Sequence, residues 1–222
     1  MTVLHLADEG EAADLAAFLS RLLHYDRGAA VRLQAAGTAL AVFGRPPSFE
    51  VLAVRAVRLA KPYEDGLDVT LDVTVSAGEL LESVDERGAT AVVPGAVTGP
   101  PWAGLLPPRG GWRPEPGLPE PDALRSLVAA AVAEFRSRTQ ELPAERRTRA
   151  ELDRIGRDIW SRTVGDTRLP VRAVHAAQSL GFLRPGVPLA LFSSGAWLRL
   201  RTPYGSIAVR RTGLGALDVS VR

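Results

Sequence analysis

The side chains best suited to recognition chemistry in this sequence lie within residues 170–180. Arg172, His175, Gln178 and Ser179 all occur in this short stretch. Arg172 and His175 are three residues apart, so a helix would place them on the same face. Arginine pairs with guanine edges and glutamine with adenine edges in the major groove of DNA. These four residues are therefore candidates for nucleic-acid binding.

Further arginines follow in a region typical of a β-hairpin: Arg199, Arg201, Arg210 and Arg211. Arginine binds phosphate through paired, charge-assisted hydrogen bonds. A helix in the major groove followed by such a hairpin would form a winged helix-turn-helix, in which the hairpin contacts the DNA backbone. The alternative is a solvated strand face, because Arg199 and Arg201 alternate with leucines along the strand.

The sequence contains no recognisable catalytic or metal-binding motif. The histidines His5, His24 and His175 are scattered, and none belongs to an HExxH motif. Cysteine is absent, and no glycine-rich loop carries a phosphate-binding lysine. Asp68 and Asp72 would share a strand face about 13 Å apart, which is too far for one metal ion. We assign no catalytic residue, metal or cofactor, and an enzyme of unrecognised type stays open as a third hypothesis.

The basic residues of the C-terminal half would be positioned by helices and a hairpin. A helix is expected from Asp122 until Pro143 ends it. Thr148 and Glu151 form a capping box for the next helix, and Pro170 is suited to the first position of a third. Strands are predicted at residues 189–192, 196–202 and 206–211, with a short edge strand at 216–221. The order of elements indicates a helical domain ending in a winged-helix-like hairpin.

The first hundred residues combine strand patterns with two helix starts. Asp8 with Glu11 and Ser76 with Glu79 form capping boxes. The intervening segments alternate apolar and polar residues, as in strands with one buried face. Strands are predicted at residues 2–7, 29–36, 38–44, 49–60, 67–75 and 90–93. The resulting order, β-α-β-β-β-β-α-β, predicts a two-layer α/β domain.

Between these halves the sequence is rich in proline and glycine and lacks periodicity. This connector contains Trp102 and Trp112. Tryptophan in an irregular segment can pin the segment onto the protein surface. Alternatively, the connector is a docking segment for a partner with an aromatic-lined groove, with both tryptophans as contact residues.

The net charge of +2 conceals an uneven distribution. Residues 1–121 hold 10 basic and 16 acidic residues, a net charge of −6, whereas residues 122–222 hold 17 and 9, a net charge of +8. The basic half could attract an anionic partner, or the two halves could attract each other. Because 26 of the 27 basic residues are arginine, arginine at a given position says little about selection for its guanidinium group.

Together these patterns predict an α+β protein with three parts: an α/β sheet domain (1–98), a Pro/Gly connector (99–121) and a basic helical domain with a C-terminal hairpin (122–222). The first functional hypothesis is a non-enzymatic interaction or regulatory protein that binds a protein partner or itself as a homodimer. The alternative is a DNA-binding regulator. No segment approaches the roughly 18 apolar residues of a membrane span or resembles a signal peptide, so a cytoplasmic location without membrane contact is expected.

Overall fold

The computed structural model describes residues 2–60 and 71–211. Its strands are β1 (Val3–His5), β2 (Ala30–Ala36), β3 (Ala39–Gly44), β4 (Leu52–Arg58), β5 (Asp72–Ser76), β6 (Thr90–Val92), β7 (Arg113–Glu115), β8 (Ala190–Ser194), β9 (Trp197–Thr202) and β10 (Gly205–Arg210). Its α-helices are α1 (Glu9–Tyr25), α2 (Ala77–Glu82), α3 (Pro121–Glu141), α4 (Arg149–Trp160) and α5 (Val171–Ser179). Short 3-10 helices are η1 (Pro47–Phe49), η2 (Pro101–Gly104) and η3 (Ala144–Arg146).

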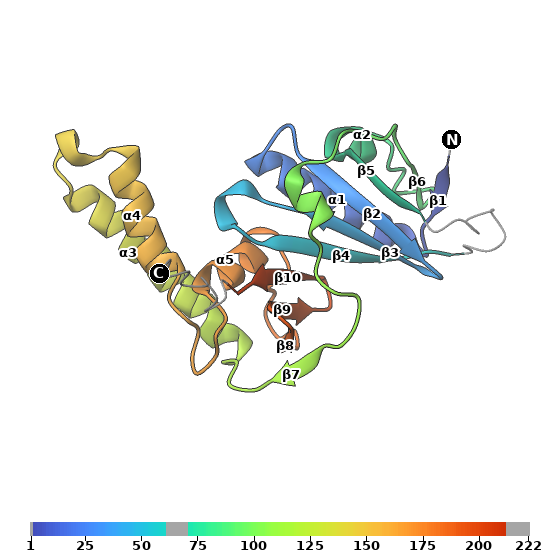
Figure 1. Ribbon diagram of the computed structural model, residues 1–222. Helices are drawn as coiled ribbons and strands as arrows, with labels where there is room; N and C mark the ends of the chain where they lie inside the picture. The colour runs from blue at the N-terminus through green and yellow to red at the C-terminus, as the bar shows by residue number, and fades with distance from the viewer. Residues whose placement is uncertain (1, 61–70, 212–222) are drawn as a thin grey trace, which may run out of the picture.

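The α+β class and the order of elements are confirmed. In the N-terminal half, β1, α1, β2, β3, β4, β5, α2 and β6 follow the predicted β-α-β-β-β-β-α-β order. In the C-terminal half, three helices precede β8, β9 and β10 (Figure 1). The fold class could therefore be predicted from hydrophobic periodicity and turn residues alone.

All three predicted capping boxes place an N-cap side chain on the expected backbone amide. Asp8 accepts a hydrogen bond from the Glu11 amide at 2.8 Å. Ser76 accepts from the Glu79 amide, and Thr148 from the Glu151 amide, both at 3.3 Å. Each bond satisfies one of the amides that a helix leaves unpaired in its first turn.

One sheet of eight strands extends through both halves of the chain, in the order β5-β2-β3-β4-β10-β9-β8-β7. The junction is antiparallel pairing between β4 and β10, in which Ser206 lies opposite Val54 and Ala208 opposite Leu52. The predicted hairpin is therefore part of the central sheet and does not stand alone as a wing. β1 and β6 form a separate two-stranded sheet.

The core lies on the face of the large sheet that the helices cover. Helix α1 buries an apolar stripe that includes Leu15, Phe18, Leu19 and Leu22. The Phe18 ring stacks on Phe182, which follows α5, with ring centroids 5.7 Å apart. The buried residues of α1, α5 and the strands form one continuous cluster, so the two halves share a core.

Helices α3 and α4 form a hairpin that projects from the sheet (Figure 1). Glu134 of α3 accepts two hydrogen bonds from Arg162, at 2.6 and 2.9 Å. Arg138 of α3 donates to Asp158 of α4 at 2.5 Å. These ion pairs join the two helices along the exposed side of the hairpin.

The strands differ from the prediction most clearly in two places. The strand predicted at 49–60 begins only at Leu52, because Pro46 and Pro47 lead into the 3-10 helix η1. The connector predicted at 99–121 contains the short strand β7, which pairs with β8 at the edge of the sheet. The strand predicted at 67–75 is described only from residue 71 onward, and the strand predicted at 216–221 lies outside the described residues.

Within residues 2–60 and 71–211, none of the helices combines the length and the apolar character needed to cross a lipid bilayer.

Candidate functional site

The residues predicted to bind nucleic acid through a helix lie on α5, which packs against β10 and the α3–α4 hairpin. Gln178 is exposed, whereas Arg172, His175 and Ser179 are half-buried. The His175 ring stacks on Trp160 with centroids 4.6 Å apart and meets Phe49 edge-on at 5.0 Å. Burial lowers the pKa of His175. Much of this candidate set therefore faces neighbouring elements.

The arginines of the predicted wing separate into two groups. Arg199 and Arg201 of β9 lie on one face of the sheet, opposite the face that carries the buried Leu198 and Leu200. Arg210 is exposed at the end of β10, and the half-buried Arg211 donates to the Gly195 carbonyl. Because Leu198 and Leu200 share the core with α5, the β9 arginines and α5 are on opposite faces of the sheet.

Two adjoining hollows open on the sheet face that carries Arg199 and Arg201. One, of about 360 Å³, is lined by residues of β4, β8, β9 and β10 and by Trp112 of the connector. The other, of about 210 Å³, lies over β2, β3 and β4, beneath Pro107, Pro108 and Arg109. Val54 and Arg199 line both hollows. We call the two hollows together the arginine groove.

Arg199 is the central residue of the arginine groove. Its Nε donates to Ser206 Oγ at 2.9 Å, and its guanidinium carbon is 5.6 Å from the Trp112 ring centroid. Trp112 is itself fixed, because its Nε1 donates to the Pro108 carbonyl at 3.0 Å. Of the Arg199 nitrogens, only Nε has a protein acceptor among the described residues. The two terminal nitrogens can therefore serve an external acceptor.

The positive charge of Arg199 has no neighbouring countercharge among the described residues. Burial, and then repulsion from Arg201, lowers the pKa of Arg199. An arginine nonetheless stays protonated in proteins. Among the described residues, no carboxylate lies within ion-pair distance of Arg109, Arg199 or Arg201. An anion in the groove would supply the missing negative charge.

The carboxylate at one edge of the groove is already paired. Asp72 on β5 accepts hydrogen bonds from Arg32 Nε at 2.7 Å and Nη2 at 3.0 Å, and another from Gln34 at 3.1 Å. The Arg32 hydrogen bond is the main cause of a lowered Asp72 pKa. Arg32 also donates to the Ala103 carbonyl and so attaches η2 to the sheet. Trp112 lines the groove, whereas Trp102, in η2, lines neither hollow.

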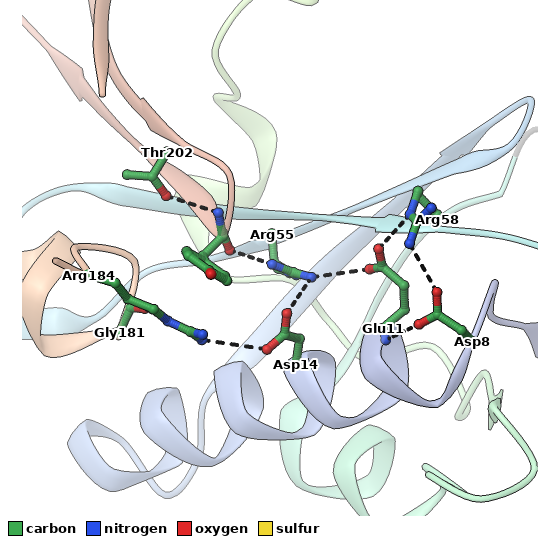
Figure 2. Close-up of polar contacts among 9 residues, drawn as sticks. Asp8, Glu11, Asp14, Arg55, Arg58, Gly181, Arg184 and Thr202 are labelled. Atoms are coloured by element: carbon green, nitrogen blue, oxygen red, sulfur yellow. Dashed lines mark hydrogen bonds and ion pairs between the residues drawn. The ribbon is translucent and has the colours of Figure 1, made fainter. Parts of the chain in front are cut away.

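Part of the charge asymmetry of the chain is neutralised within the molecule (Figure 2). Arg55 of β4 donates to Glu11 at 3.1 Å and Asp14 at 3.0 Å on α1, and to the Tyr204 carbonyl at 2.7 Å. Arg184, from the C-terminal half, lies 3.6 Å from Asp14 and 3.6 Å above the Tyr204 ring. The acidic face of α1 therefore contacts the basic half directly.

The part of the chain that the structure describes contains no group of three His, Asp or Glu side chains close enough to bind a metal ion. The arginine groove likewise contains no pair of carboxylates and no nucleophile beside a base. The side chains that line the groove are arginines, hydroxyls, an amide and apolar groups.

Comparison with known families divides the chain at the connector. Residues 1–104 match a domain of unknown function, DUF8010. Residues 107–214 match a second domain of unknown function, DUF8185. The chain matches no curated protein. Because β4 lies in the first matched region and β9 in the second, the arginine groove is formed by both.

Three residues of the groove were predicted as site residues from the sequence: Arg199 and Arg201 as nucleic-acid contacts, and Trp112 as a contact for a docking partner. The alternation along β9 correctly placed the two arginines on one face. Val54, Ser206 and Arg109 were missed, since nothing local connects them with β9. Pairing between β4 and β10 brings them together, and this long-range contact has no signature in a single sequence.

Proposed function

We propose that this protein is a non-enzymatic interaction protein that binds a protein partner through the arginine groove. The observation that carries the proposal is Arg199: half-buried, held by Ser206 and Trp112, with its terminal nitrogens open to the groove. A cation fixed in this way loses little side-chain entropy on binding, and pre-organisation of this kind favours affinity. Arginine and tryptophan are also enriched among the residues that dominate binding energy at interfaces.

The arrangement favours a protein partner over duplex DNA. A winged helix would present α5 and the hairpin arginines to one duplex, yet α5 and the β9 arginines lie on opposite faces of the sheet. The DNA-binding alternative keeps its own measurement, which is anisotropy of a labelled random duplex at low ionic strength. It predicts affinity that falls steeply with added salt and with Arg172→Ala.

Site-specific photo-crosslinking tests the proposal. Ala56 is exposed and lines the groove, so a photoreactive phenylalanine analogue at position 56 would touch any bound partner. In the cells that produce this protein, we expect a discrete crosslinked species that disappears when Arg199→Ala is added. A species of twice the protein's mass would identify the partner as a second copy of the chain.

The matched control is the same analogue at Ala130, an exposed position on α3. If positions 56 and 130 give the same products, or if the product from position 56 persists in Arg199→Ala, the groove is not the binding surface and the proposal is wrong.

A further inference from the structure

We infer that the partner segment held in the arginine groove is an extended acidic peptide. A carboxylate would lie between Arg199 and Arg201, and an apolar side chain two residues along, on the same face of the peptide, would enter the hollow beside Val54. This inference rests on the proposed function and specifies the chemistry of the partner.

The groove is long enough to hold an extended peptide. Its lining runs from Gln34 on β2 to Phe192 on β8, across the six adjacent strands β2, β3, β4, β10, β9 and β8. At roughly 4.8 Å between neighbouring strands, this is a span of about 24 Å. An extended chain rises about 3.3 Å per residue, so roughly seven residues would span the groove. A small metabolite would fill one hollow, whereas a peptide can fill both.

The charges of the groove are spaced both across its width and along its length. Arg199 and Arg201 are two residues apart on one face of β9, which separates their Cα atoms by roughly 7 Å. A peptide that crosses the strands runs perpendicular to β9, so one carboxylate can lie between these two side chains. Arg109 adds a third cation over the other hollow, and no carboxylate from the described part of the chain lines either hollow. Carboxylates at intervals along a peptide complement these cations, and arginine binds them in a planar, two-bond geometry.

Apolar surface lies between the charged side chains of the groove. Ala56 is exposed beside Val54, while Phe192 and Trp112 are half-buried walls of the larger hollow. Apolar side chains next to acidic ones in the partner would cover this surface. An interface with an apolar centre and charged surroundings has the usual anatomy of a protein contact.

Single-stranded nucleic acid also combines negative charge with apolar surface, but it needs aromatic rings on which bases stack. Trp112 already faces the Arg199 guanidinium, Phe43 in the smaller hollow is only 7% exposed, and Phe192 is a half-buried wall of the larger hollow. The described lining therefore lacks a series of exposed rings on which successive bases could stack. The peptide is therefore the better match.

Fluorescence anisotropy of the full-length protein with a labelled ten-residue peptide tests the inference. Three glutamates and two leucines alternate at the odd-numbered positions of the peptide, so that an extended chain presents all five on one face, and serine fills the other positions. The control peptide carries lysine in place of glutamate. We expect the acidic peptide to bind and the lysine peptide not to bind. Arg199→Ala should weaken binding at least tenfold and Arg201→Ala several-fold, whereas Arg136→Ala, an exposed arginine on α3, should leave it unchanged.

Two further variants distinguish a loss of peptide binding from a loss of folded structure. Arg199→Lys retains the charge but loses the planar fork, so intermediate affinity is expected. Ala56→Glu changes only an exposed side chain and places a negative charge in the groove, and it should abolish binding; Ala130→Glu on α3 is its control. Circular dichroism verifies that each variant is folded.

Three results would overturn the inference: the acidic peptide fails to bind, its binding is indifferent to Arg199→Ala and Ala56→Glu, or oligothymidine of ten nucleotides binds more tightly. The crosslinking experiment then separates the two proposals. A crosslink from position 56 that depends on Arg199, together with no peptide binding, would leave the protein-binding function standing and reject only the acidic chemistry.

Discussion

Arg55 is the most deeply buried ionic side chain at the contact between the two halves, with 5% of its surface exposed. It donates to Glu11, Asp14 and the Tyr204 carbonyl (Figure 2). Arg55→Ala would remove the buried partner that Glu11 and Asp14 share, while Arg58 still pairs with Glu11 and Arg184 with Asp14. We expect a loss of about 1–3 kcal/mol in the free energy of unfolding, measured by urea denaturation.

The matched control for this prediction is Arg58→Ala. Arg58 also pairs with Glu11, but 69% of its side chain is exposed. Solvent screens such a pair, so the loss should be far smaller than for Arg55→Ala. Equal losses would mean that burial is not what gives Arg55 its importance.

His175 makes stability depend on pH. Its burial lowers its pKa below the ordinary 6.5, so the folded state favours the neutral imidazole. The unfolded chain then binds more protons than the folded chain as pH falls through 6.5. The stabilisation is complete above that pH and is lost progressively below it.

We expect the free energy of unfolding to fall less between pH 7 and pH 5 in His175→Phe than in the wild type, measured by urea denaturation at each pH. Phenylalanine keeps a flat ring against Trp160 and Phe49. Gln178→Phe, at an exposed and non-titrating position of α5, serves as the control and should keep the wild-type pH dependence. The prediction is wrong if both variants behave alike.

At the scale of residues, the sequence predicted which side chains could bind a partner, but not which of them contact one another in the fold. Alternation along β9 separated Arg199 from Leu198, as the structure confirms. The partners of Arg199 are Ser206, seven residues later, and Trp112, 87 residues earlier. The second contact depends on the path of the connector across the sheet, for which proline-rich sequence gives no register.

Among the elements, the α3–α4 hairpin contains a network of ion pairs. The Arg162 hydrogen bond is the main cause of a lowered Glu134 pKa, and the Arg138 hydrogen bond lowers the pKa of Asp158. Such carboxylates stabilise the folded state above their ordinary pKa values of 4.5 and 3.8, and this stabilisation is lost as pH falls through the lowered values.

Hydrogen exchange of α3 and α4, corrected for the intrinsic effect of pH on exchange, should therefore show less protection at pH 3.5 than at pH 6. In Glu134→Gln, protection should already be reduced at pH 6 and change less on acidification. Unchanged protection in the wild type at pH 3.5 would show that apolar contacts, such as Phe135 against Trp160, are sufficient for the hairpin.

The turn between β9 and β10 is constrained by a close approach. A β-carbon at Gly205 would lie 2.5–2.7 Å from three ring atoms of Phe182, which is buried against Phe18. Gly205→Ala should cost about 1–3 kcal/mol through overpacking, measured by urea denaturation. Gly110→Ala, at a position with open space around it, should cost much less. Similar losses would contradict the steric argument.

The elements that could be predicted are those with local signals. Three helix starts had a capping box, and the structure contains a helix at each. Pro170, predicted as the first residue of a helix, is the N-cap of α5, and α3 was predicted from its apolar periodicity. Strand β7 was missed because it has three residues, one of them Pro114, which donates no backbone hydrogen bond. Proline is tolerated there because β7 is an edge strand.

For the whole molecule, the shared sheet predicts that neither half is stable alone. A fragment of residues 1–104 would leave the β4 edge unpaired and the core residues of α1 uncovered where Phe182 packs. We expect residues 1–104 and 107–222, produced separately, to aggregate or to lack cooperative unfolding, and to recover it when refolded together. Circular dichroism with thermal melting measures this. Cooperative unfolding of residues 1–104 alone would show that the β4–β10 pairing is dispensable.

The place of β10 between β4 and β9 also sets the order of events during translation. Strand β4 leaves the ribosome about 150 residues before the strand that pairs with it. At roughly 5–20 residues per second, its edge waits on the order of ten to thirty seconds for a partner. During that interval, the nascent chain presents an open strand edge to other chains, so chaperone binding to the nascent chain should be strongest before residue 205 emerges and decline thereafter.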